Sequence, residues 1–293
     1  MNAVRFRPVG PDDADDALAA GDAPAEQASA GRAPGPQAGA AGAIDRARSQ
    51  GRAALMAYLP CGFPSLRASI DACQALIRGG VDLIELGLPY SDPVMDGPII
   101  GEAVTAALEA GFRVADVFEA TAELAPTGVP IEVMTYYNPV FRRGEERFAA
   151  DLAAAGGAGL VTPDLIPEES GAWVAAADRF GLDKIFLVAP SSPEARLRLT
   201  ANACRGFTYA TSTMGVTGLR ASLSELARPL VERTRAAGAE NVCVGVGVST
   251  ADQAAEVASF ADGVIVGSAF VKRLAADQDL EGFAADLRAA VAR

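Results

Sequence analysis

Short apolar runs alternate with amphipathic stretches from about residue 42 to the C-terminus. Eight of these runs are aliphatic or β-branched, are bounded by Gly, Pro or Asp, and have the length of buried strands. They are AALMAYLP (53–60), VDLIELGLP (81–89), PIEVMTY (130–136), GAGLVTPD (157–164), DKIFLVAP (183–190), GFTYATS (206–212), NVCVGVG (241–247) and DGVIVGS (262–268).

Helix-start signals follow several of the runs. Examples are SLRASIDACQALIRGG after the first, PEESGAWVAAADRFG after the fourth and STADQAAEVASFA after the seventh. A repeated strand–helix unit places successive strands parallel, because the helix carries the chain back across the sheet. Eight units predict an α/β fold, a (β/α)8 TIM barrel, which usually needs about 250 residues. An open doubly wound sheet is the alternative.

Residues 1–41 have a different composition. Ala, Gly, Pro and Asp dominate this segment, and branched or aromatic apolar residues are scarce. Because such a segment cannot bury enough apolar surface to fold, we expect a disordered tail over 1–41 and one barrel domain over 42–293. A partner-binding arm is the alternative, although the segment lacks the apolar anchors that such arms use.

Charge and residue usage exclude several classes of function. The net charge of −12 argues against a nucleic-acid partner. The chain has no histidine, so proton transfer must fall to carboxylates, Tyr, Lys or Cys. Its four cysteines (Cys61, Cys73, Cys204 and Cys243) lack CxxC spacing, and we expect buried free thiols with no metal site. Neither a membrane span nor a secretory signal is recognisable, so we expect a cytoplasmic protein.

The second run contains a carboxylate, Glu85, in an otherwise apolar strand. Alternation places it on the face that suits the barrel interior, with Val81, Leu83 and Gly87. Burial there raises the pKa of a carboxyl group toward the range useful for proton transfer. The alternative is a structural glutamate paired with Lys or Arg. The loop that follows, PYSDPVMDGP, adds Asp92 and Asp96 in rigid turns, so two carboxylates in different surroundings can face one substrate.

Glycine clusters follow three late runs: MGVTG (214–218), VGVGVST (244–250) and IVGSAF (265–270). Barrels often bind phosphate with the loops after strands seven and eight and a helix N-terminus, and Ser249 and Ser268 stand at predicted helix starts. Three tyrosines, Tyr58, Tyr136 and Tyr209, lie near the ends of predicted strands. They can wall a flat apolar substrate or be ordinary core tyrosines. The residues thus indicate a metal-free site for a phosphorylated molecule with an apolar ring.

Several motifs resemble the tryptophan synthase alpha chain family. The most specific is LIELGLPYSDPVMDGP (83–98), and further matches are YLPCGFP (58–64), MTYYNPVFRRG (134–144), PDLIPEES (163–170), GVTG (215–218) and VGSAF (266–270). The resemblance covers residues 42–293 and not the tail. It implies retro-aldol cleavage of indole-3-glycerol phosphate into indole and glyceraldehyde 3-phosphate.

The resemblance also implies roles for individual residues. Glu85 would be the acid and base, and Asp96 would stabilise or remove the indole N–H proton. The substrate would contact the tyrosines and a phosphate cradle, which comprise Tyr58, Tyr136, Tyr209, Gly218, Gly247, Gly267 and Ser268. Asp92, Pro93 and Asn138 would face a beta chain in an alpha2beta2 heterotetramer, and pyridoxal phosphate would belong to that partner, with no cofactor in this chain.

Two positions depart from the family pattern. Thr213 stands where many members have arginine, and Gly101 stands where glutamine is common. These departures favour, as an alternative, a free-standing lyase that releases indole. A non-catalytic allosteric partner of a beta chain is a further alternative, but it has no use for an isolated carboxylate in a strand.

Overall fold

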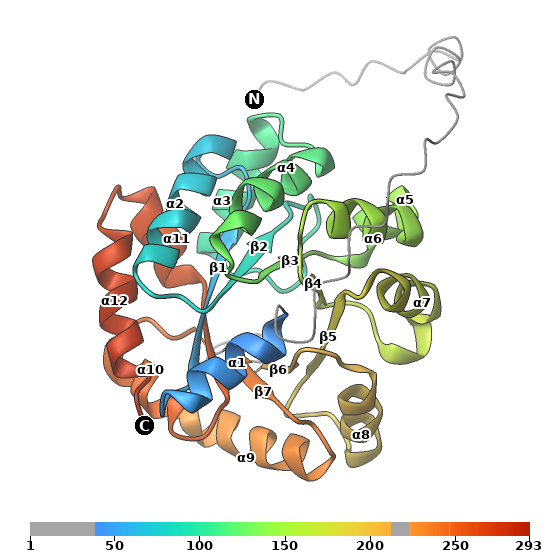
Figure 1. Ribbon diagram of the computed structural model, residues 1–293, viewed down its shortest axis with the longest axis vertical. Coiled ribbons are helices and arrows are strands. Elements are labelled where there is room, and N and C mark those ends of the chain that lie inside the picture. Colours follow the sequence, from blue (N-terminus) through green and yellow to red (C-terminus); the bar gives the residue numbers. More distant parts are fainter. Residues whose placement is uncertain (1–38, 212–222, 246) are drawn as a thin grey trace, which may run out of the picture. The chain divides into compact units, whose positions relative to one another are not determined.

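The computed structural model describes residues 39–211, 223–245 and 247–293, which belong to one compact unit. Eight parallel strands pair in sequence order, and the last pairs with the first, so the sheet is a closed barrel with helices around it (Figure 1). The strands are β1 (Ala54–Pro60), β2 (Leu83–Gly87), β3 (Ile131–Met134), β4 (Gly159–Thr162), β5 (Asp183–Val188), β6 (Thr208–Thr211), β7 (Val242–Gly245) and β8 (Gly263–Val266). The predicted TIM barrel is confirmed, and each strand lies inside its predicted run.

At least one helix follows each strand, and one precedes the first strand. The helices are α1 (Ala40–Ser49), α2 (Leu66–Arg78), α3 (Pro98–Glu109), α4 (Val114–Leu124), α5 (Tyr137–Arg143), α6 (Glu145–Ala154), α7 (Gly171–Phe180), α8 (Glu194–Ala203), α9 (Leu223–Ala236), α10 (Ala251–Ala258), α11 (Ser268–Ala275) and α12 (Leu280–Ala290), with short 3-10 turns η2 (Ala125–Thr127) and η3 (Pro167–Glu169). In the parts of the chain described, none of them is long and apolar enough to cross a lipid bilayer.

Helix α2 illustrates how the sequence sets these boundaries. The Ser65 side chain accepts a hydrogen bond from the Ala68 N–H and caps the first turn. Ile70, Cys73 and Leu76 recur at helical spacing and face the barrel, so their burial holds the helix on the sheet. The helix ends at Arg78, and Gly79 is the capping residue that follows it.

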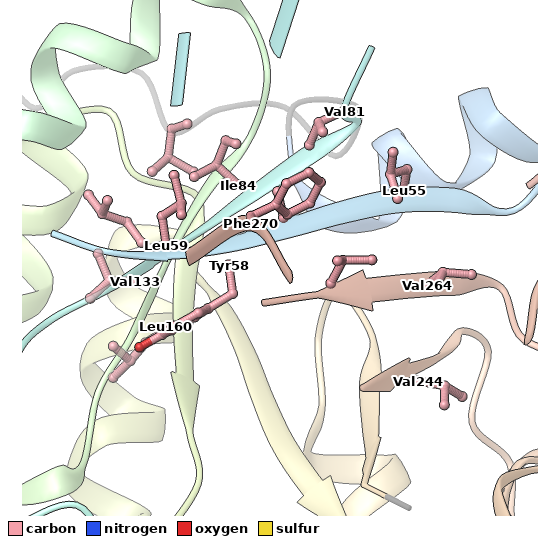
Figure 2. Close-up of a cluster of buried hydrophobic side chains, with 14 of the residues drawn as sticks. Leu55, Tyr58, Leu59, Val81, Ile84, Val133, Leu160, Val244, Val264 and Phe270 are labelled. Carbon is pink, nitrogen blue, oxygen red and sulfur yellow. The ribbon is translucent and has the colours of Figure 1, made fainter. Parts of the chain in front are cut away.

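Two apolar layers make up the core. The outer layer lies between the sheet and the helices. Figure 2 shows Leu55 and Leu59, which belong to it, on one side of β1, whereas Tyr58 points to the opposite side of the strand. The inner layer fills the barrel with Met56, Leu83 and other inward side chains. Ala40, Ile44 and Ala47 of α1 belong to this inner layer, so α1 closes the amino-terminal end of the barrel.

The structure changes four details of the expectations. Helix α1 begins at Ala40, inside the predicted tail, because the small side chains on its buried face fit the barrel floor. Val81 precedes β2 and packs in the outer layer, so its predicted place on the interior face is wrong. All four cysteines are free thiols, but Cys204 is only partly buried. Thr250, not Ser249, caps α10.

Candidate active site

A cavity of about 720 Å³ opens at the carboxyl-terminal ends of the strands. Its lining includes Glu85, Asp96, Tyr58, Tyr209, Gly247, Gly267 and Ser268, which the sequence places on six different segments. Met134, Leu187 and Ile265 add apolar walls. The cavity therefore combines two carboxyl groups, two phenols, apolar surface and a helix start, at the end of the barrel where the sequence predicts them.

Glu85 lies in the middle of β2 and is 0% exposed. Neither of its carboxyl oxygens has a hydrogen-bond partner among the described residues, and no described cation forms an ion pair with it. The alternative of a structural glutamate paired with Lys or Arg therefore fails within the described chain. Burial raises the pKa of this carboxyl from 4.5 to about 8. Glu85 can thus hold or release a proton near neutral pH.

Asp96 has different surroundings on the loop after β2. The Tyr136 hydroxyl donates a hydrogen bond to Asp96 Oδ1 at 3.1 Å and accepts one from the Met95 N–H at 2.9 Å. Partial burial raises the pKa of Asp96, while the hydrogen bond from Tyr136 acts in the opposite direction. Tyr136 is not among the residues that line the cavity, so its contact is with the loop that carries Asp96.

Tyr58 and Tyr209 lean across neighbouring strands that carry glycine at the contact. A Cβ atom added to Gly87 would lie 2.5 Å from the Tyr58 hydroxyl, and one added to Gly245 would clash with the hydroxyl of Tyr209. Burial is the main cause that raises the pKa of both phenols well above their ordinary value. Both hydroxyls therefore stay protonated and can donate hydrogen bonds into the cavity.

The start of α11 contributes to the lining of the cavity. Gly267 is the residue before the helix, and Ser268 is its first residue. The first turn of a helix leaves N–H groups without intrahelical partners, and these groups attract an anion. Gly247 has a φ of +73°, which favours glycine there. Gly218, the remaining predicted member of the cradle, and Thr213 lie outside the described residues.

Exposed apolar side chains that the sequence analysis missed lie in the segments that follow β2, β3 and β4. Val94 on the loop after β2 is 79% exposed, Phe141 in α5 is 63% exposed, and Met95 and Ile166 are also exposed. Asp92 and Asn138 are exposed nearby in sequence, and Pro93 is partly exposed. Large apolar residues beside polar ones, directly after predicted strands, were the signal in the sequence that could have revealed them. Likewise, Met134, Leu187 and Ile265 could have been found as inward positions near strand ends.

Comparisons with known proteins identify the family. The tryptophan synthase alpha chain family model matches residues 44–292. The tryptophan synthase alpha chain of Leifsonia xyli is 57% identical over 233 residues, which are 79% of this chain and 89% of that protein. That of Acidothermus cellulolyticus is 54% identical and covers 86% of this chain and 96% of the relative. A chain of Mycobacterium tuberculosis tryptophan synthase superimposes with a TM-score of 0.82 at 50% identity, covering 87% of this chain and 98% of that chain. This chain therefore belongs to the tryptophan synthase alpha chain family.

Proposed function

We propose that the protein cleaves indole-3-glycerol phosphate to indole and glyceraldehyde 3-phosphate, as the alpha subunit of a tryptophan synthase. The observation that carries the proposal is the fully buried carboxyl of Glu85, which has no cationic partner in the described chain, in a cavity with apolar walls and the first turn of a helix. The substrate has the matching parts, namely an indole ring, a glycerol chain and a phosphate. Met134, Leu187 and Ile265 suit the ring, and the start of α11 suits the phosphate.

The chemistry needs one group that first gives and then takes a proton. Protonated Glu85 donates to indole C3 while Asp96 takes or stabilises the ring N–H proton, which gives an indolenine. The Glu85 carboxylate then removes the proton of the C3′ hydroxyl, the C3–C3′ bond breaks, and its electron pair restores the aromatic ring as the nitrogen regains its proton. A carboxyl with a pKa of about 8 suits this alternation because neither protonation state is strongly favoured near neutral pH.

The phenols and the loop would support these steps. Tyr209 lies beside the place for the glycerol chain, and Tyr58 lies beside Glu85 on the neighbouring strand. Tyr136 acts indirectly in this proposal, because it holds Met95 and Asp96 and does not line the cavity. We therefore propose that Tyr136 positions Asp96, whereas the sequence predicted that it contacts the substrate.

A beta chain is the proposed partner at the rim. Asp92, Pro93 and Asn138 would contact it, and the exposed side chains of Val94 and Phe141 supply apolar surface for the same interface. The solved relatives include a tryptophan synthase complex of Pyrococcus furiosus. We expect an alpha2beta2 heterotetramer in the cytoplasm, with pyridoxal phosphate in the beta chain. In this proposal the catalytic domain includes helix α1 and so begins at Ala40, two residues before the boundary predicted from the sequence.

Indole release tests the subunit hypothesis. Purified protein should release indole from indole-3-glycerol phosphate slowly, and addition of a tryptophan synthase beta chain should increase the rate at least about tenfold, as coupling between sites commonly allows. Fast release that a beta chain leaves unchanged would favour the free-standing lyase. Absence of release under both conditions would favour the non-catalytic partner and contradict the proposal.

A charge placed at the start of α11 tests the phosphate position. Ser268→Asp should raise KM for indole-3-glycerol phosphate at least about tenfold, because a carboxylate within about 5 Å of the phosphate repels it by more than ~1.4 kcal/mol. Ser268→Asn has a similar size and no charge, and should change KM much less. Steady-state kinetics of both variants decide the point, and equal KM values for the two would place the phosphate elsewhere.

A further inference from the structure

A second buried glutamate, Glu132, lies beside Glu85 and has no role in the proposed cleavage. It is the register partner of Glu85 on the adjacent strand β3, and it is fully buried. Ile131 and Val133 pack in the outer layer, so alternation directs Glu132 into the barrel. In the described chain neither of its carboxyl oxygens makes a hydrogen bond of normal geometry, and no cation forms an ion pair with it. An ionised carboxylate in such a place is strongly disfavoured.

The group that faces Glu132 is another carboxyl, Asp183. Gly159 on β4 is the register partner of both Glu132 on β3 and Asp183 on β5. A Cβ atom at Gly159 would lie 2.6 Å from Glu132 Oε2 and 2.6 Å from the Asp183 Cβ. The absence of a side chain at Gly159 therefore lets the two acidic side chains approach each other across β4.

Asp183 has the partners that a negative charge requires. Its Oδ2 accepts a hydrogen bond from the Ala40 N–H at 2.9 Å, at the first turn of α1, where the helix dipole also favours an anion. Arg205 Nε lies 3.7 Å from its Oδ1. Of the two acids, Asp183 is thus the better place for the charge and Glu132 the better place for a proton.

We propose that Glu132 and Asp183 bind one proton between them, carried by Glu132 and directed to Asp183, and that this proton ties β3, β5 and the start of α1 together at the barrel floor. Two adjacent carboxylates in a dry interior cannot both ionise at moderate cost, and sharing a proton removes the repulsion. The site is independent of the cleavage reaction.

The groups around the pair favour a proton on Glu132 and a charge on Asp183. The pKa of Glu132 is raised well above its ordinary value, first by burial and then by Asp183 and Glu85, while Arg205 opposes the shift weakly. Burial also raises the pKa of Asp183, but the Ala40 N–H, Glu132, Arg205 and Lys184 all act to lower it. The pair therefore keeps its proton at a pH where exposed carboxyl groups have lost theirs.

The test is the pH dependence of unfolding of the full chain. A glutamate with a raised pKa in the folded state stabilises the fold fully only below its unfolded pKa, and that contribution is lost as pH rises toward the folded value. Glutamine can still donate to Asp183 and does not titrate. Above about pH 5, for as long as the folded pair keeps its proton, the folding equilibrium constant of the wild type should fall about tenfold per pH unit relative to Glu132→Gln, because the unfolded chain releases one proton more. An identical pH dependence of the two proteins would overturn the proposal.

A spectroscopic measurement keeps the proposal testable if Glu132→Gln folds poorly. Among the described acids only Glu85 and Glu132 are completely buried, so infrared spectra of Glu85→Gln at pH 7 should retain the carbonyl band of protonated Glu132. Asp183→Asn in the same background should shift or abolish the band, because its acceptor is replaced. A Glu85→Gln spectrum without any protonated-acid band at pH 7 would show that Glu132 is ionised and overturn the proposal.

Discussion

Glu85→Gln is expected to lower kcat for indole-3-glycerol phosphate cleavage by about 10³-fold, a loss typical of removing a general acid–base group. Glutamine has nearly the same shape and can fill the same buried position on β2, but it can neither protonate indole C3 nor accept the proton of the C3′ hydroxyl. KM should change little, because ring and phosphate contacts come from other residues. Steady-state measurement of indole release provides both constants.

Glu132→Gln is the matched control for that loss. It makes the same chemical change at the register partner of Glu85, one strand away and equally buried. A variant at this position should keep most of the wild-type kcat at pH 7, since Glu132 does not line the cavity. Retention of more than a tenth of the activity in Glu85→Gln would rule out Glu85 as the acid and base.

Glu85→Gln should also raise the free energy of unfolding above that of the wild type. The pKa of Glu85 is about 8 in the folded protein against an ordinary value of 4.5, so above pH 4.5 the folded state must hold a proton that the unfolded chain releases. This lowers wild-type stability by about 1.4 kcal/mol per pH unit, or about 3 kcal/mol at pH 7. Glu85→Gln escapes this penalty, so its advantage should be near zero at pH 4.5, grow with pH and level off above pH 8.

Denaturant unfolding at pH 5 and pH 7 measures the effect. The difference in unfolding free energy between Glu85→Gln and wild type should be several-fold larger at pH 7 than at pH 5. An equal difference at both values would mean that Glu85 titrates normally in the folded protein. Together with the kinetic result, a stability gain would identify a residue that is retained for chemistry at the expense of the fold.

Features that depend on local periodicity were predictable from the sequence. The alternation in VDLIELGLP assigned Glu85 to the interior, and the order of strand and helix signals predicted the barrel and its active end. Helix α1 was not predicted, and the start of the barrel domain was set at residue 42, inside this helix, because Ala and Gly give little periodic signal. Features that depend on tertiary geometry were also out of reach. Tyr136 holds the Asp96 loop because that loop folds back over β3, which no spacing in the sequence reveals.

The acidic pair shows the same limit more sharply. Glu132 and Asp183 are fifty-one positions apart by their residue numbers, and they approach only because β3, β4 and β5 pair in a register that puts Gly159 between them. The sequence shows a glutamate in a strand at Glu132 just as at Glu85. Their roles differ because the carboxyl of Glu85 lines the cavity, whereas that of Glu132 faces Asp183.

In the part of the chain that the structure describes, helix α1 closes the amino-terminal end of the barrel, and the cavity opens at the other end. The proposed substrate must therefore enter, and both products must leave, at the carboxyl-terminal end of the barrel. Glyceraldehyde 3-phosphate is charged and favours water. Indole is apolar and favours the exposed apolar side chains of Val94 and Met95. The proposed beta subunit, bound at these side chains, would therefore contact indole at the end of the barrel from which it leaves.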